Sequence, residues 1–411
     1  MKNKLKRKGF GLVLVMLLWG CFLKAQSLGS LVEEALHSNP EIQKFEWQYA
    51  RASERVNEVN TLPNTEFGMG YFASEPETRT GPQRFKVSAK QMLPWFGSIT
   101  ARENYASALA DAKYEDIVVA KRKLIASVSQ SYYKLFAIRS KQIVLGQNIK
   151  LLKDYEVLAL NSLEVGKASA VDVLRLQMRQ NELERLKKVL EQNFVAERTV
   201  LNKLLNRQVD VEVTVADSLP IPEDNMEFAL EDLALHPELL KYDKLYHSVE
   251  QSELLNQKES SPMFGFGLDY IAVSERPEMD FSDNGKDVVM PMVSLSIPIF
   301  NKKYRSKTKQ NQLLQKELLS EKQLRLNKLE ALFQKAVTDR SAARISYNTQ
   351  SLNLKQAKNA ENILIKGYET GTIDFNDVLD VQELQLKFQI DRIEAVKSYY
   401  VQTSIINYLS K

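Results

Sequence analysis

The chain of 411 residues has little of what most enzymes and metalloproteins use. It has a single cysteine, Cys21, which excludes internal disulfides, cysteine-based zinc sites and a cysteine nucleophile in the rest of the chain. It has 3 histidines, too few for a metal centre built from several of them. A glycine-rich phosphate loop and a His-Glu-x-x-His motif are also missing. We therefore expect no enzymatic activity, no metal site and no cofactor.

Glycine and proline are scarce as well. The sequence has 15 Gly and 12 Pro, which indicates few turns and therefore long elements. With 44% hydrophobic and 26% charged residues, the composition is typical of a folded chain and not of a disordered one. These proportions disfavour an α/β enzyme, which needs many loops, and favour long helices.

The basic residues are concentrated at the N-terminus. Residues 1–25 hold six of the 56 Lys and Arg and no acid, so the net charge of +4 does not indicate a nucleic-acid partner. A cationic stretch at 2–8 precedes an apolar run at 10–18 that is too short to span a bilayer as a helix, which predicts a signal peptide over residues 1–25. Three outcomes stay open: cleavage after Ala25, lipidation of Cys21 at a degenerate lipobox, or an uncleaved anchor.

The sequence repeats itself once. Four motifs recur in the same order, shifted by 197, 197, 204 and 205 residues: 39–41 at 236–238, 67–71 at 264–268, 93–97 at 297–301, and 172–174 at 377–379. Four ordered matches at a nearly constant offset indicate a tandem duplication. We predict a first repeat over 26–205, a linker or equatorial segment over 206–227, and a second repeat over 228–411.

Two pairs of short segments alternate apolar residues with small or polar ones. They predict strands at about 65–73 and 84–92 in the first repeat, and at about 263–273 and 288–297 in the second. Segments of roughly ten residues fit strands that cross a bilayer at a tilt.

Each strand pair is followed by two long helical stretches without proline. We predict helices over 98–165 and 170–205, and over 303–370 and 375–409. A helix of this length, at 1.5 Å per residue, extends roughly 100 Å. The second helix of each pair repeats apolar residues every seven positions, as coiled coils do: Leu176, Leu183 and Leu190, and Leu379, Leu386 and Ile393.

Four strands are too few for a closed barrel, because the smallest single-chain barrels have about eight. An open sheet with an apolar face would leave unpaired edges in lipid. The sequence therefore predicts that several chains share one barrel, and three copies would supply about twelve strands. The alternative is a periplasmic coiled-coil scaffold or adaptor protein without a membrane channel.

The sequence resembles the TolC-like outer-membrane efflux proteins over residues 31–409. The resemblance rests on 39–41 with its echo at 236–238, on the turns at Pro94 and Pro298, and above all on the run 366–380. It implies a mainly α fold with a small membrane β part, in which a homotrimer forms a 12-strand barrel and an α-helical periplasmic tunnel. It also implies a passive channel in the outer membrane, in contact with its lipid and extending into the periplasm. Such a channel would export solutes together with a periplasmic adaptor (membrane fusion) protein and an inner-membrane resistance-nodulation-division pump.

By the same resemblance, Asp377 and Asp380 belong to an acidic ring that forms the periplasmic gate. They lie three positions apart on one helix face, and a ring of carboxylates favours cations. The alternative is that they cap or solvate the start of their helix. Tyr368 and Asp172 match a family pair that holds the gate shut through a hydrogen bond between phenol and carboxylate. Ile373 departs from the family pattern, which has an arginine there, so gate locking is expected to be weaker or built from other residues.

The cargo stays open between heavy-metal cations and drugs. The segment 91–97 with Ala101 and Arg102 is similar to family members that serve heavy-metal pumps of the Cus/Czc type. Five methionines near the strands have sulfur atoms that suit soft cations, but the simpler interpretation is that they fill apolar surface: Met69, Met92, Met263, Met290 and Met292. Trp95, Tyr71 and Tyr270 are candidates for an interfacial aromatic girdle, whereas Trp47 is expected to pack in a core.

Overall fold

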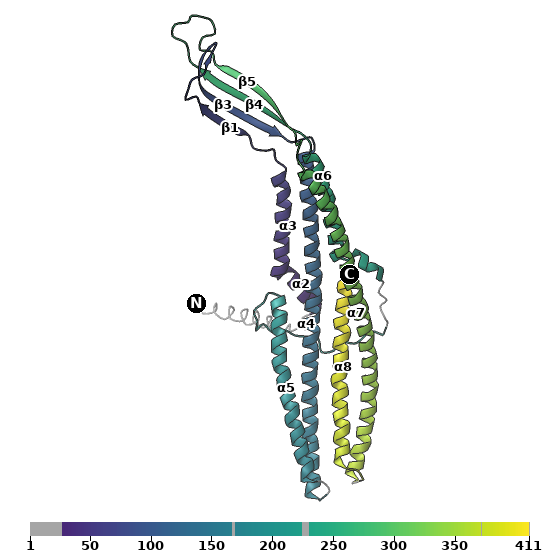
Figure 1. Ribbon diagram of the computed structural model, residues 1–411. Coiled ribbons are helices and arrows are strands. Elements are labelled where there is room, and N and C mark those ends of the chain that lie inside the picture. Colours follow the sequence, from purple (N-terminus) through teal and green to yellow (C-terminus); the bar gives the residue numbers. More distant parts are fainter. Residues whose placement is uncertain (1–26, 167–168, 224–229, 371, 411) are drawn as a thin grey trace, which may run out of the picture. The chain divides into compact units, whose positions relative to one another are not determined.

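The computed structural model describes residues 27–166, 169–223, 230–370 and 372–410 (Figure 1). The predicted signal peptide and Cys21 lie outside the described residues. The chain divides into two compact units that do not follow the predicted repeats. The helical unit comprises Met1–Pro40, Lys121–Leu230 and Ala331–Lys411, and the sheet unit comprises Glu41–Ala120 and Glu231–Glu330. Each unit therefore takes segments from both halves of the sequence, and the repeat boundaries stay a prediction.

The sheet unit contains four antiparallel strands in the order β1 (Glu66–Tyr71), β3 (Gly81–Leu93), β4 (Met263–Val273) and β5 (Val288–Ser296) (Figure 1). The ends of these strands lie within three residues of the predicted ones. A two-residue strand that the sequence did not indicate, β2 (Glu77–Thr78), pairs with β3 in the loop after β1.

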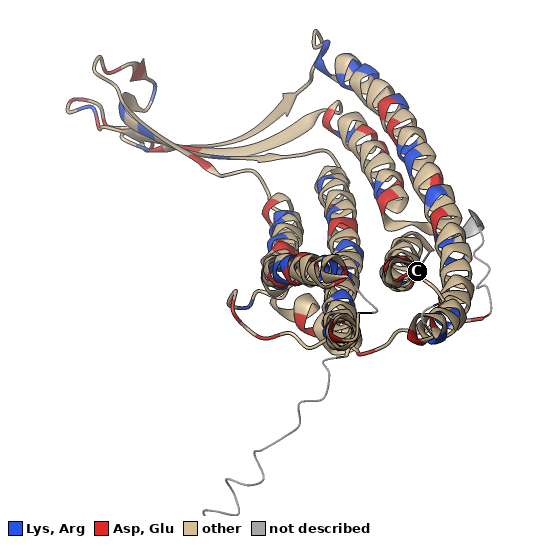
Figure 2. Ribbon diagram, turned by 90° about the horizontal axis from the view of Figure 1, so that it is seen from below, with Lys and Arg blue, Asp and Glu red and all other residues tan. Residues whose placement is uncertain are grey.

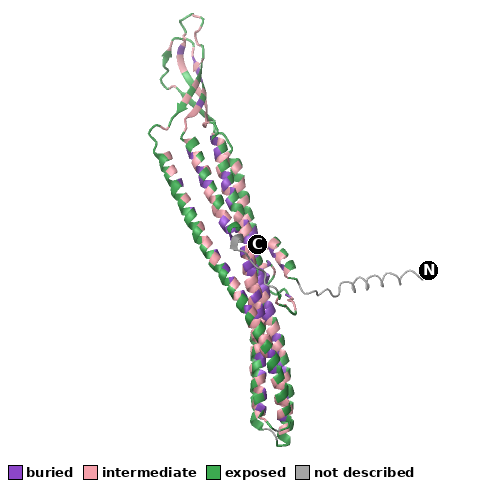
Figure 3. Cartoon of the chain, turned by 90° about the vertical axis from the view of Figure 1, so that its right-hand side faces the viewer, coloured by how far each residue is buried: buried purple, intermediate pink, exposed green. Residues whose placement is uncertain are grey.

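The register places apolar side chains on one face of this sheet. Phe67 pairs with Ala89, Ala89 with Leu268, and Leu268 with Pro291, and because side chains alternate along a strand, residues in line share a face. We call it the apolar face; its large side chains are Phe67, Met69, Tyr71, Phe85, Val87, Leu93, Phe264, Phe266, Leu268, Tyr270, Val289, Val293 and Leu295. Many of them are exposed in the single chain (Figure 3), with Met69 at 84% and Val293 at 75%.

The opposite face, here the polar face, carries small and polar residues: Gly68, Gly70, Lys86, Ser88, Lys90, Gly265, Gly267, Asp269 and Ser294. Asp269 is fully buried and forms an ion pair with Lys86 of the neighbouring strand. Four of the methionines that the sequence singled out also stand on the polar face, namely Met92, Met263, Met290 and Met292, whereas Met69 stands on the apolar one.

The helices of the sheet unit are α3 (Pro40–Val59), α6 (Pro237–Glu259) and the beginnings of α4 (Ser98–Glu164) and α7 (Lys303–Glu369), with a short 3-10 turn η1 (Leu230–Leu235). Acidic and basic residues are interspersed along the helices, while the strands carry few of them (Figure 2). Ion pairs tie α4 to α6: Arg102 Nη2 lies 3.2 Å from Glu259 Oε1, and Lys241 Nζ lies 2.6 Å from Asp116 Oδ1. On α3, Trp47 is 74% exposed, so the prediction that it packs in a core is wrong for the single chain.

The helical unit is made of two antiparallel hairpins, the end of α4 with α5 (Ala170–Leu204) and the end of α7 with α8 (Phe375–Ser410) (Figures 1 and 3). The four helices end within one residue of the predicted limits. The heptad residues Leu176 and Leu183 of α5 are fully buried, whereas Leu379 of α8 packs at the margin of the same core. Among the described helices, none combines the length and the hydropathy needed to span a bilayer.

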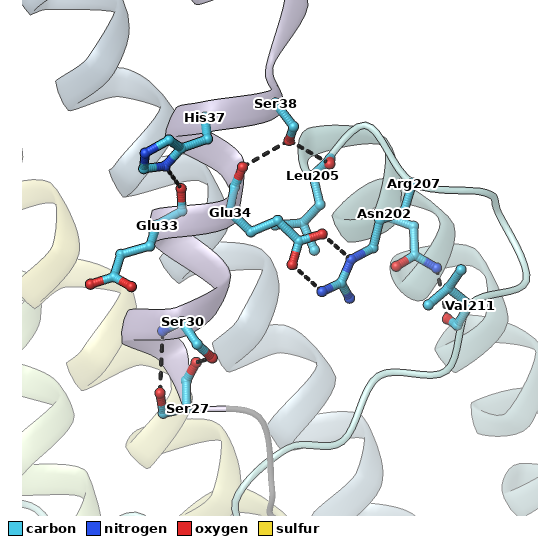
Figure 4. A network of polar contacts seen from close by, with 10 residues as sticks. All are labelled: Ser27, Ser30, Glu33, Glu34, His37, Ser38, Asn202, Leu205, Arg207 and Val211. Carbon is cyan, nitrogen blue, oxygen red and sulfur yellow. Dashed lines mark hydrogen bonds and ion pairs between the residues drawn. The ribbon is translucent and has the colours of Figure 1, made fainter.

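A polar network attaches α2 (Leu28–Ser38) to the C-terminal end of α5 (Figure 4). Arg207 forms a two-pronged ion pair with Glu34, and the Ser38 hydroxyl donates to the carbonyl of Leu205 at 2.8 Å. The extended segment that follows is held by the Asn202 amide, which donates to the carbonyl of Val211 at 2.8 Å. Side-chain contacts therefore replace a sheet ladder in the described part of the linker.

Candidate functional site

Side-chain caps mark the start of the second helix in both hairpins. At the start of α5, the Ser169 hydroxyl accepts from the N–H of Val171 at 3.1 Å, and the Asp172 carboxylate accepts from the N–H of Ser169 at 3.0 Å, which is a capping box. At the start of α8, the Asp374 carboxylate accepts from the N–H of Asn376 at 2.8 Å. These caps define where α5 and α8 begin, and thereby where the predicted gate residues stand.

An apolar core joins the two hairpins behind these turns. The ring of Phe375 lies 4.8 Å from the ring of Tyr368 and 6.1 Å from that of Tyr155. Leu176 and Val378 fill the space between the hairpins and are almost completely buried. Because this core includes residues of α4, α5, α7 and α8, a shift of one hairpin against the other would disturb its packing.

A polar cluster crosses the same interface. The Tyr155 hydroxyl of α4 donates to Glu361 of α7 at 2.6 Å, and the Gln385 amide of α8 donates to the other oxygen of that carboxylate at 2.8 Å. Burial and then the hydrogen bond to Glu361 raise the pKa of Tyr155 well above its ordinary value. The phenol therefore stays protonated and acts as a donor to Glu361, whose carboxylate links α4, α7 and α8.

A second ionic cluster links α4 to α8. Glu394 pairs with Lys141 and with Lys397. Partial burial favours a raised pKa for the Glu394 carboxyl, but hydrogen bonds from the two lysines outweigh it and lower the pKa below its ordinary value. The folded state therefore favours the charged carboxylate.

Tyr368 and Asp172 do not form the predicted hydrogen bond within the chain. Tyr368 is buried against Phe375, and its hydroxyl has no hydrogen-bond partner among the described residues. The Asp172 carboxylate instead accepts from the N–H of Ser169, three positions away. The prediction of a direct bond is wrong for the single chain, because a local donor at the helix start is nearer than a phenol on another hairpin.

Asp377 and Asp380 stand on the first two turns of α8 and are exposed. Asp374, rather than either of them, supplies the capping carboxylate, so the side chains of Asp377 and Asp380 are not needed as caps. Among the described residues, neither carboxylate has a hydrogen bond or ion pair, and no cluster of three or more His, Cys, Asp or Glu could hold a metal ion. The two acids are therefore available to solvent and to ions.

Two arginines that the sequence did not single out face this acidic turn. Arg175 of α5 donates to Asn376 of α8, and Arg179 Nη2 lies 3.1 Å from Glu383 Oε1. Both arginines line a hollow of about 290 Å³ together with Asp380 and Glu383. Position 373, where the family pattern has an arginine, holds an isoleucine that packs beside the core. In this chain the positively charged side chains that bridge the two hairpins therefore come from α5. The sequence could have indicated them through the spacing of Arg175 and Arg179, which lie one helical turn apart near the start of a helix.

Known proteins resemble this chain in sequence over part of its length and in fold over nearly all of it. Residues 31–207 match the family described as outer membrane efflux protein. No curated protein matches the chain. Among solved structures, CusC, described for its folding and transmembrane channel formation, superposes with a TM-score of 0.78 at 13% identity, covering 95% of this chain and 94% of its own.

Two further structures show the same fold. VceC, the outer membrane protein from Vibrio cholerae, gives a TM-score of 0.74 at 15% identity, over 93% of this chain and 96% of its own. The CmeC outer membrane channel of Campylobacter jejuni gives 0.73 at 14% identity, over 93% of this chain and 85% of its own. The mainly helical fold with a small β part is confirmed over nearly the whole chain. Residues 31–207 are therefore similar in sequence to the outer membrane efflux proteins, and nearly the whole chain has the fold of CusC, VceC and CmeC.

Proposed function

We propose that this protein is the outer-membrane duct of a tripartite efflux system, a passive channel through which solutes leave the cell envelope. Three copies would combine their sheets into one barrel of about twelve strands and their helical hairpins into a periplasmic tunnel. The duct catalyses no reaction and holds no cofactor.

The observation that carries this proposal is the sheet with a continuous apolar face and two free edges. Within the described residues, β1 and β5 each pair on one side only. In lipid every backbone N–H and C=O group must be paired, so the free edges require neighbouring copies. A water-soluble scaffold, the alternative function, would instead leave the apolar face in contact with water, which costs about 25 cal/mol for each Å² of apolar surface.

The polar face has the properties of a channel wall. Lys86, Lys90 and Asp269 alternate with glycines and serines there, as expected for strands with lipid on one side and water on the other. The fully buried Asp269 is compensated by its ion pair with Lys86. In the proposed barrel this face lines the lumen.

We place the periplasmic gate at the hairpin tips. Asp377 and Asp380 of three copies would form a ring of carboxylates that attracts cations and repels anions. The lock that holds this ring narrow would be the pair between Arg179 and Glu383, which joins the two hairpins. Tyr368 and Asp172 contribute through packing and capping.

The partners that this duct requires are a periplasmic adaptor protein and an inner-membrane pump of the resistance-nodulation-division class. The cargo class, heavy-metal cations or drugs, is set by that pump, since a passive duct need not bind its cargo selectively. The segment 91–97, with Ala101 and Arg102, is similar to family members that serve heavy-metal pumps, so the heavy-metal branch is the first one to test.

Planar-bilayer recording on the purified, detergent-extracted protein tests the proposal. The expected result is a small, steady conductance that favours cations, from a species that sizes as a trimer. A protein that fractionates as soluble and gives no conductance would contradict the duct and support the scaffold.

A further inference from the structure

An apolar cavity lies where the sheet meets the helices of the sheet unit. Its volume is about 680 Å³, and its wall comes from the turn between β3 and α4 and from the start of β4. The half-buried Trp95 stacks on Phe264, with ring centroids 5.7 Å apart and planes at 19°. Leu93, Phe96 and Phe266 complete the apolar wall.

The cavity is continuous with the apolar face, because Leu93, Phe264 and Phe266 belong to both. These residues stand on β3 and β4, the two central strands. A neighbouring copy that extends the sheet would add its strands at the edges, on β1 and β5, and would leave the central strands uncovered. A molecule that covers the apolar face over the central strands therefore also contacts the cavity wall at Leu93, Phe264 and Phe266.

A cationic side chain stands beside this apolar cavity. Gly97, which lines the cavity, adopts a left-handed conformation with φ of 78°, and a Cβ placed there would lie 3.7 Å from Lys258 Nζ. Lys258 is exposed in the last turn of α6, and among the described residues its ammonium has no ion pair. An apolar pocket with a cation beside it matches a molecule that has a hydrocarbon chain and an anionic head.

We propose that this cavity binds one acyl chain of a phospholipid from the periplasmic leaflet of the membrane, with Lys258 next to the phosphate of its headgroup. The inference rests on the proposed function, because it requires the apolar face to be in lipid. It adds a defined lipid site where the barrel leaves the membrane, which would fix the depth of the sheet in the bilayer.

Tryptophan fluorescence in brominated phospholipid vesicles tests the site, since bromine quenches an indole that it contacts. Of the 3 tryptophans, one lies in the predicted signal peptide and two, Trp47 and Trp95, in the mature chain. The W47F variant therefore reports on Trp95 alone. A matched control carries W47F, W95F and L268W, because Leu268 lies in the middle of the apolar face.

Quenching of Trp95, strongest with bromines near the headgroup end of the acyl chain, is the result expected. The tryptophan of L268W should be quenched most by bromines near the methyl end. If L268W is quenched and Trp95 is not, protein rather than lipid covers the cavity, and this inference is overturned while the proposed function stands. If neither is quenched, the sheet is not in lipid and the proposed function fails too.

Charge reversal tests the headgroup contact. K258E should lower the quenching of Trp95 by brominated anionic phospholipid more than by the zwitterionic form. K244E is the matched control, an exposed lysine on α6 without an ion pair among the described residues. Equal effects of K258E and K244E would overturn the role of Lys258.

Discussion

The pair between Arg179 and Glu383 offers the sharpest test of how the gate is locked. The two side chains are 27% and 62% exposed, with Nη2 and Oε1 3.1 Å apart, so one pair contributes about 0.2–1 kcal/mol. If three copies close together, their contributions add to about 0.6–3 kcal/mol. Because 1.4 kcal/mol corresponds to a factor of ten, R179A should raise the ratio of open to closed channels by about 3-fold to 150-fold.

Single-channel recording in planar bilayers measures this ratio as open probability and mean conductance. The matched control is R185A, since Arg185 pairs with Glu182 of the same helix at 2.7 Å and cannot link two hairpins. Reversing both charges, in R179E with E383R, should restore the closed state that R179E alone loses. A channel of R179A that is no more open than those of R185A and the wild type would refute the lock.

Three further predictions concern the helical unit. D377A with D380A should weaken cation selectivity and block by multivalent cations, measured as reversal potential and as residual current; unchanged values would place the acidic ring elsewhere. The two lysine partners of Glu394 lower the pKa of its carboxyl in the folded state below the ordinary 4.5, so the charged group stabilises the fold at neutral pH and this contribution is lost as pH falls through the folded pKa. In E394Q the melting temperature should therefore depend less on pH over that acidic range than in the wild type. A variant with the same pH dependence as the wild type would contradict this role of Glu394. Y155F should lower the free energy of unfolding by about 1.5–3 kcal/mol, because it removes a hydrogen bond to a carboxylate, whereas Y368F should leave it nearly unchanged, as judged by denaturant unfolding. A strongly destabilised Y368F would mean that its hydroxyl binds a group outside this chain.

The long elements could be predicted from the sequence because their patterns extend over many residues. Helices α4 and α7 could be predicted because their sequences contain no proline. On α5, Leu176 and Leu183 recur at the coiled-coil interval, and the structure confirms that both are buried between helices. The strands followed from alternation alone, since each one has a polar and an apolar face. The resemblance at 366–380 then indicated the family.

The contacts at the site could not be predicted in the same way. The pairs of Arg175 with Asn376 and of Arg179 with Glu383 join residues about 200 positions apart, and no local pattern reports them. The expected bond from Tyr368 to Asp172 failed because a carboxylate three residues after a serine at a helix start has a nearer donor in the backbone. That capping box could have been recognised from the spacing, and it would have removed Asp172 from the list of lock partners.

Trp47 shows a different limit of sequence reasoning. Its aromatic character suggested a core position, yet α3 buries only Ile42 within the chain, and Trp47 is largely exposed. A helix with one buried residue gains little from packing within its own chain, so the partner of its remaining apolar surface has to be sought outside it.

The central claim is that copies of this chain share one sheet through the edges of β1 and β5. Disulfide trapping in a C21S background tests it directly, because Cys21 is the only cysteine of the sequence and its replacement leaves no competing thiol. Met69→Cys on β1 would be combined in turn with V289C, V293C and L295C on the same face of β5, and with M290C on the opposite face as control. The account predicts a covalent trimer in membranes for one same-face pair and none for the control; monomers from every same-face pair, in membranes where the protein is folded, would contradict it.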